Sequence, residues 1–89
     1  MKLNKEQAGI IATSLKHGRY QKLLTQGEIA SIAGITRRTW GKLERAEAES
    51  ASPVTICKAL KAALGETGKR QAWKAITEQV EETGKHGLE

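Results

Sequence analysis

The chain has 89 residues, a formal net charge of +5, one cysteine and one proline. This length lies below the usual domain size of roughly 100 to 150 residues, so we expect one domain with a small hydrophobic core. The hydrophobic content of 38% and the charged content of 28% are typical of a globular chain and exclude an intrinsically disordered one.

Cysteine and histidine are too few to build a metal site. Cys57 is the only cysteine, which excludes an intrachain disulfide and a cysteine-based metal centre within one chain. Inside an apolar helical pattern, Cys57 is expected to be a small buried residue. His17 and His86 lie far apart in the sequence. We therefore expect no metal and no other cofactor.

The distribution of charge indicates where a partner would approach. Residues 1–24 carry five Lys or Arg against one acid, whereas residues 66–89 carry four bases against five acids. A polyanion is therefore expected to meet the first two thirds of the chain. No apolar run approaches the roughly 20 residues of a membrane span, and the first residues lack the apolar stretch of a signal peptide. These features predict a cytoplasmic protein.

Apolar residues at helical spacing predict an all-α fold of five helices without strands. The expected ranges are about 5–17, 26 to the stop at Gly34, 37 onward past Leu43, 53 to the stop at Gly65, and about 69–82. Each predicted start has a capping residue and each stop a glycine or a loop. The caps are Asn4, Thr25, Thr36, Ser52 and Thr67, and the first and last helices are expected to end at Gly18 and Gly84.

The stretch TQGEIASIAGITRRTWGKLER, from Thr25 to Arg45, predicts two short helices joined by a turn that contains glycine. Ala30 is small enough for the two helices to approach closely, and Gly34 accepts the positive φ of the turn. Trp40 and Leu43, three residues apart, form the inward face of the second helix. The residues left outward or flanking are Arg37, Arg38, Gly41, Lys42 and Arg45.

Residues 24–65, LTQGEIASIAGITRRTWGKLERAEAESASPVTICKALKAALG, resemble the Cro/CI-type (XRE-type) helix-turn-helix of phage, plasmid and bacterial repressors. Small plasmid regulators of the Kor type are the nearest in character, and the implied fold is lambda-repressor-like. Two features depart from the family pattern. The connection between the first two helices is longer than usual, and Trp40 is bulkier than the usual Ile or Val.

The resemblance implies that the helix beginning at Arg37 enters the major groove of DNA. The implied base-reading residues are Arg37, Arg38, Gly41 and Lys42. The implied backbone contacts are Gln26, Thr25 and Arg45, and the resemblance implies association with the nucleoid or a plasmid. Thr36 and Thr39 can bind a phosphate or touch a thymine methyl. Lys22 and Arg19, near the end of the first helix, are either further phosphate contacts or solvated surface cations. Chemistry supports part of this assignment, because an arginine fork matches O6 and N7 of guanine. The expected function is therefore sequence-specific binding of double-stranded DNA by a transcriptional repressor.

Residues 1–66 would form the DNA-binding domain, residues 67–84 a C-terminal helix for dimerisation, and residues 85–89 a flexible tail. Trp73, Ile76 and Val80 are the expected dimer interface of a homodimer on a palindromic operator, although the same stripe could instead cover the chain's own core. No small-molecule ligand is indicated. An antitoxin that represses its own operon is the alternative function. An enzyme, such as a small nuclease, is not expected, because the acids form no cluster with histidine.

Overall fold

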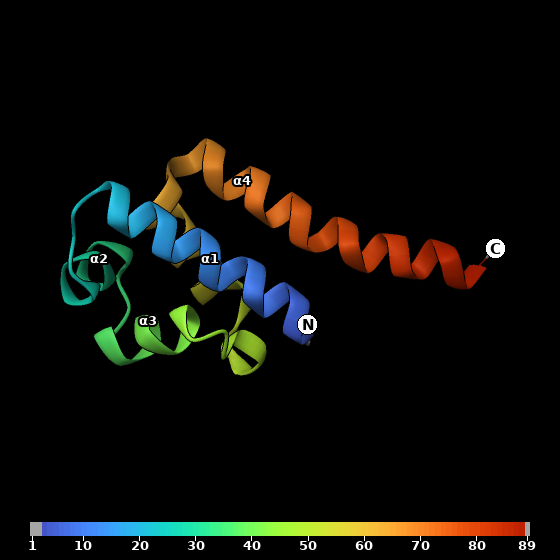
Figure 1. Ribbon diagram of the computed structural model, residues 1–89, viewed down its shortest axis with the longest axis horizontal. Coiled ribbons are helices and arrows are strands. Elements are labelled where there is room, and N and C mark those ends of the chain that lie inside the picture. The colour runs from blue at the N-terminus through green and yellow to red at the C-terminus, as the bar shows by residue number, and fades with distance from the viewer. Residues whose placement is uncertain (1–2, 89) are drawn as a thin grey trace.

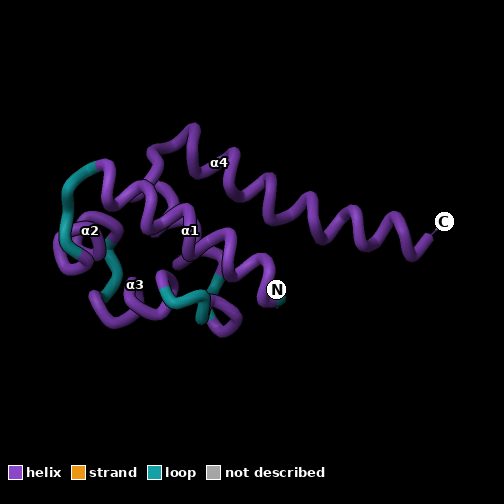
Figure 2. Tube along the Cα trace, in the orientation of Figure 1, coloured by secondary structure: helices purple, strands orange, loops and turns teal. Residues whose placement is uncertain are grey.

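The computed structural model describes residues 3–88, without the side chains of residues 50 and 79–88. Its elements, in chain order, are α1 (Lys5–Gln21), α2 (Gln26–Ala33), α3 (Arg37–Glu44), a short 3-10 helix η1 (Ala48–Ser50) and α4 (Pro53–Leu88) (Figures 1 and 2). No strand occurs among the described residues. The all-α prediction is confirmed, but the prediction of five helices is wrong, because there are four α-helices.

The predicted helix starts are confirmed where a short polar side chain caps the backbone. Asn4 Oδ1 accepts from the Gln7 amide at 2.8 Å, and Gln7 Oε1 accepts from the Asn4 amide at 2.9 Å. Thr25 and Glu28 form the same reciprocal box at the start of α2. Such a cap satisfies amides that have no partner inside the helix and stabilises it by about 1 kcal/mol.

Gly18 does not end α1, which continues to Gln21. The reason is tertiary: α4 crosses α1 at this glycine, and a Cβ built there would lie 2.4 Å from the carbonyl oxygen of Ala63. Gly18 therefore permits a close helix crossing and does not act as a helix terminus. Because α1 is longer than predicted, only residues 22–25 connect it to α2. The long connection expected from the sequence is absent.

The last two predicted helices form one element, α4, that bends at Gly65. Gly65 adopts φ 79° and ψ 178°, a conformation open almost only to glycine, and the helix resumes directly after it. Thr67 consequently lies inside the helix and does not cap it. Gly84 does not end the helix either, since a glycine with helical dihedrals weakens a helix by about 1 kcal/mol without stopping it. The tail expected at residues 85–89 is helical as far as Leu88.

The bend divides α4 into a proximal arm, residues 53–64, and a distal arm, residues 66–88. The start of the proximal arm is as predicted, with the Thr55 amide donating to Ser52 Oγ at 3.2 Å and Pro53 at the first helical position. In Figure 1 the distal arm runs beside α1 and then projects beyond it. No described helix is both long and apolar enough to cross a bilayer.

The core lies between α1, α2, α3 and both arms of α4. Its largest fully buried apolar side chains are Ile11, Leu15, Ile29, Trp40, Leu43, Ile56, Leu60 and Ile76. The inward prediction for Trp40 and Leu43 is thus confirmed. Each such side chain contributes roughly 1.5 to 3 kcal/mol relative to exposure. The segment between α3 and α4 also reaches the core, through Ala48 of η1.

For Ile76 the structure fits the alternative left open by the sequence, that the stripe covers the chain's own core. Its side chain is fully buried in the core of its own chain, and its carbonyl accepts from Gln7 Nε2 at 3.1 Å. The distal arm packs against α1 at this point, so the face that bears Ile76 is already covered. Trp73 is half-buried at the edge of the core. The side chain of Val80 lies outside the described residues.

Candidate nucleic-acid interface

The turn between α2 and α3 directs the start of α3 outward. Gly34 takes the left-handed conformation, φ 76° and ψ 30°, and the Ile35 amide donates to the Ala30 carbonyl at 3.0 Å. Ile35 packs against the core, and Thr36 caps α3 by accepting from the Thr39 amide at 3.1 Å. With its next turns anchored by buried side chains, α3 presents Arg37 and Arg38 to solvent.

One open groove of about 300 Å³ is lined by five residues from α2, from α3 and from the position directly after α3. We call it the arginine groove. The five residues are Gln26, Arg37, Arg38, Gly41 and Arg45. All five are among the residues that the sequence assigned to DNA contact. The structure therefore brings together the predicted contacts of the two helices on one surface.

Gly41 forms the floor of the arginine groove. It is buried, and a Cβ at this position would lie 3.2 Å from Arg45 Nη1 and 3.8 Å from Gln26 Oε1. A larger side chain would displace these groups or fill the space between them. Glycine thus keeps the floor open and lets a ligand approach the backbone of α3 closely.

The arginine groove carries an excess of positive charge. Between described side chains, no ion pair involves Arg37, Arg38 or Lys42. Arg45 pairs with Glu47 at 2.7 Å, but both side chains are more than half exposed, so water screens the pair. Two cations at a helix start also oppose the helix dipole, at a cost of a few tenths of a kcal/mol each. A bound anion would neutralise the excess positive charge and would offset the unfavourable interaction with the helix dipole.

A buried carboxylate connects the helices that carry the arginine groove. Glu44 is 3% exposed and accepts from Arg19 Nε at 2.6 Å, from Arg19 Nη2 at 2.9 Å and from Gln26 Nε2 at 3.0 Å. The indole Nε1 of Trp40 donates to the same carboxylate. One side chain therefore joins α1, α2 and α3, and it fixes Gln26 at the groove.

Sequence reasoning missed this network. One local signal pointed to the network, because Trp40 and Glu44 are four residues apart and so share a helix face. The second partner, Arg19, is 25 residues away and carries no local signal.

Both members of the buried pair stay charged near neutral pH. Burial raises the pKa of Glu44, but the hydrogen bonds from Arg19, Trp40 and Gln26 outweigh it and hold the pKa below its usual value. The hydrogen bond to Glu44 likewise raises the pKa of Arg19. The guanidinium of Arg19 is 13% exposed and donates also to the Leu24 carbonyl at 3.2 Å. It is thus engaged inside the protein, although the sequence predicted a contact with DNA.

The other predicted backbone contacts are spread more widely. Thr25 and Thr36 are exposed caps at the starts of α2 and α3, and Thr36 Oγ1 donates to Thr39 Oγ1 at 2.8 Å. Lys42 is exposed beside Thr39 in a neighbouring depression. Lys22 is apart from all of these and lines another groove with Lys58 and Lys61. The structure therefore groups the arginines but separates Lys22 from them.

No protein-family model, curated protein or solved structure matches this chain. The likeness to Cro/CI-type repressors consequently rests on the residue pattern of 24–65 alone. Within the described residues, no group of three or more His, Cys, Asp and Glu is arranged to hold a metal ion.

Proposed function

We propose that the protein binds double-stranded DNA sequence-specifically through the arginine groove, with α2 and α3 acting as a helix-turn-helix. The observation that carries this proposal is the gathering of Arg37, Arg38 and Arg45 around the glycine floor at Gly41. Three guanidinium groups on one open surface suit a ligand with many negative charges, since each can bind a phosphate or a guanine edge.

The shape of α3 suits the major groove. That groove is about 12 Å wide and admits one α-helix. Trp40 and Leu43 face the core, so the opposite side of α3, with Arg38 and Lys42, is free for base edges. Gln26 and Thr25 at the start of α2 would bind phosphate. Glu44 holds the amide of Gln26 in place, which reduces the side-chain freedom lost on binding.

Repression by a homodimer completes the proposal. One recognition helix covers only a few base pairs, so two copies related by a two-fold axis would read two half-sites about 34 to 36 Å apart. Occupation of an operator that overlaps a promoter would then block transcription.

Selection from a pool of randomised duplexes at about physiological salt tests this function. The wild-type protein is expected to enrich an inverted repeat that contains G·C pairs, and Arg37→Ala/Arg38→Ala is expected to lose that enrichment. Lys16→Ala is the matched control, because Lys16 is an exposed cation of α1 outside the arginine groove. Enrichment that is absent, or unchanged in the arginine variant, would contradict the proposal.

An antitoxin that also represses its own operon is the second candidate. It would need the same DNA surface and an additional surface for a protein partner. The exposed side chain of Ile32 beside Lys22, Lys58 and Lys61 is the observation that favours it. An isolated exposed apolar residue is common on proteins that bind nothing there, so this candidate ranks below the repressor.

A further inference from the structure

Cations exceed acids at the bend of α4. The Glu66 carboxylate lies 2.9 Å from Lys69 Nζ, 3.4 Å from Arg70 Nε and 3.7 Å from Lys61 Nζ. One negative charge therefore pairs with three positive charges. Lys58 adds a fourth cation on the proximal arm, and no ion pair between described side chains includes it. The bend is left with a local excess of positive charge.

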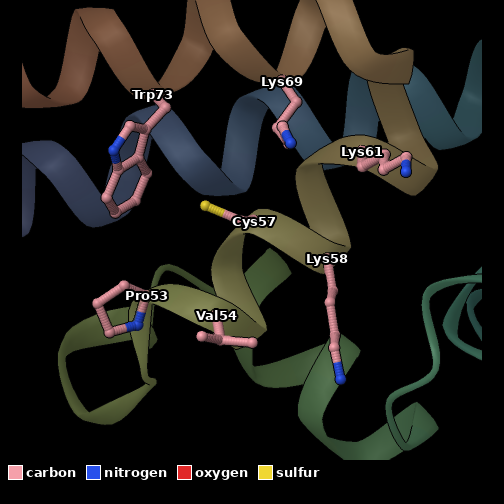
Figure 3. A pocket seen from close by; sticks show the side chains of 7 residues that line it. All are labelled: Pro53, Val54, Cys57, Lys58, Lys61, Lys69 and Trp73. Carbon is pink, nitrogen blue, oxygen red and sulfur yellow. The ribbon is translucent and has the colours of Figure 1, made fainter.

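Three of these cations, the lysines, line an open groove of about 340 Å³ between the two arms, which we call the bend groove (Figure 3). Its apolar lining is Pro53, Val54, Cys57 and Trp73, and its lysines are Lys58, Lys61 and Lys69. The Val54 side chain is 64% exposed, and Cys57, expected to be buried, is only half-buried. In Figure 3 the Cys57 sulfur, on the proximal arm, points toward the Trp73 ring on the distal arm. An apolar surface with a cationic rim suits an acidic helix that also carries apolar residues.

The chain itself contains an acidic segment of this kind. Residues 78–82 read EQVEE, with three glutamates, no base and the apolar Val80. This segment cannot reach the bend groove of its own chain, because α4 remains helical between them and separates Lys69 from Glu81 by about 18 Å. The distal arm also projects away from the body of the molecule (Figure 1). A second copy of the chain has no such restriction.

The charges along the distal arm favour one orientation of that second copy. The half nearer the bend carries Lys69, Arg70 and Lys74 against Glu66, and the following half carries Glu78, Glu81 and Glu82 against Lys85. Two arms packed antiparallel set the basic half of each against the acidic half of the other. Parallel arms would set like charges together. The antiparallel arrangement is also two-fold symmetric, so both bend grooves would be occupied.

We propose that two copies of the chain dimerise through antiparallel distal arms, with residues 78–82 of each copy at the bend groove of the other. This inference extends the homodimer of the proposed function, but it does not require DNA. It differs from the interface predicted from the sequence, because Ile76 belongs to the core of its own chain and the basic rim of the bend groove replaces it.

Charge reversal on each side of the contact gives a test with an internal rescue. Lys69→Glu/Arg70→Glu and Glu81→Lys/Glu82→Lys should each halve the molecular mass measured by light scattering at low ionic strength, because like charges would meet at both ends of the interface. An equimolar mixture of the two variants should restore the dimer, since every contact in the mixed dimer is again between opposite charges. Circular dichroism checks that each variant retains its helix content.

A matched control is Lys5→Glu/Lys16→Glu, which makes the same change in net charge on exposed positions of α1 and should stay dimeric. A wild-type chain that is monomeric up to about 1 mM, the limit of meaningful affinity, would overturn the proposal. So would two monomeric variants whose mixture stays monomeric. Failure of the DNA function is distinguishable, because Arg37→Ala/Arg38→Ala should remain dimeric whether or not the wild type selects a duplex.

Discussion

The arginine groove and the bend groove are both cationic, yet they are built in different ways. The arginine groove has a polar lining and rests on a buried carboxylate that joins three helices. The lining of the bend groove combines apolar side chains with three lysines, and the nearby Glu66 carboxylate, which is nearly half exposed, is shared by three cations. The first construction fixes Gln26 and joins the helices that carry the arginines, which suits a rigid polyanion. The second leaves apolar area uncovered, which suits a protein surface.

The largest difference between the two grooves should appear in the free energy of unfolding when the carboxylate beside each groove is neutralised. Glu44→Gln leaves the guanidinium of Arg19 without its buried partner and is expected to lower the free energy of unfolding by roughly 3 kcal/mol. Glu66→Gln removes only solvent-exposed pairs and should cost less than about 1 kcal/mol. Urea unfolding followed by circular dichroism measures both. Equal losses would show that the Glu44 network does not support the fold.

The helix crossing beside the bend offers the next test. Gly18→Ala would bring a methyl group against the backbone of Ala63 and is expected to destabilise the fold by roughly 2 to 3 kcal/mol. Gly9→Ala, on the same helix with no atom within 4 Å of its added Cβ, should stabilise by about 0.5 to 1 kcal/mol. Thermal unfolding of the two variants gives the comparison. A Gly18→Ala protein as stable as Gly9→Ala would contradict the close crossing.

Gly65→Ala should affect the bend groove while leaving the arginine groove intact. Alanine at φ 79° and ψ 178° is strained by roughly 1 to 3 kcal/mol, so α4 would tend to straighten and separate the walls of the bend groove. The expected result is a weaker dimer by light scattering, with the fluorescence of the buried Trp40, measured in a Trp73→Phe background, unchanged. A dimer of unaltered strength would show that the bend angle does not matter for association.

The smallest effect is a difference in acid sensitivity. Because the pKa of Glu44 is lower in the folded protein than in the unfolded chain, its contribution to stability is complete above about pH 4.3 and is lost as the pH falls through the folded value. Wild type should therefore lose stability below about pH 4.3 more steeply than Glu44→Gln. Unfolding midpoints measured along a pH series would reveal this, and parallel curves for the two proteins would count against a charged buried pair.

The parts of the fold that the sequence predicted correctly depend on residues close together in the chain. The capping boxes at Asn4 and Thr25 each span four residues, and the turn at Gly34 needs only one glycine with positive φ. The inward face of α3 likewise follows from the three-residue spacing of Trp40 and Leu43. The outward positions of α3 then follow by elimination, so most of the arginine groove was predictable.

The errors arise where distant residues meet. In the sequence Gly18 resembles a helix terminus, whereas in the structure it is the point where α4 crosses α1 at Ala63, 45 positions later. Arg19 resembles a surface cation until Glu44 is placed beneath it. Ile76 resembles an interface residue until the distal arm is packed against α1. The bend groove could not be predicted for the same reason, since its walls come from two arms whose angle depends on Gly65.

The most direct test of the central claim is DNA binding by wild type, Arg38→Ala and Lys22→Ala, measured by fluorescence anisotropy at two salt concentrations. Each protein is tested on one selected duplex and on one scrambled duplex. Arg38→Ala is expected to weaken binding of the selected duplex by about 1 to 3 kcal/mol more than binding of the scrambled duplex. This loss removes the discrimination between the two sequences. Lys22→Ala, outside the arginine groove, should change both duplexes alike and lower the salt dependence. Equal losses on both duplexes for Arg38→Ala would contradict the assignment of the arginine groove as the surface that reads DNA sequence.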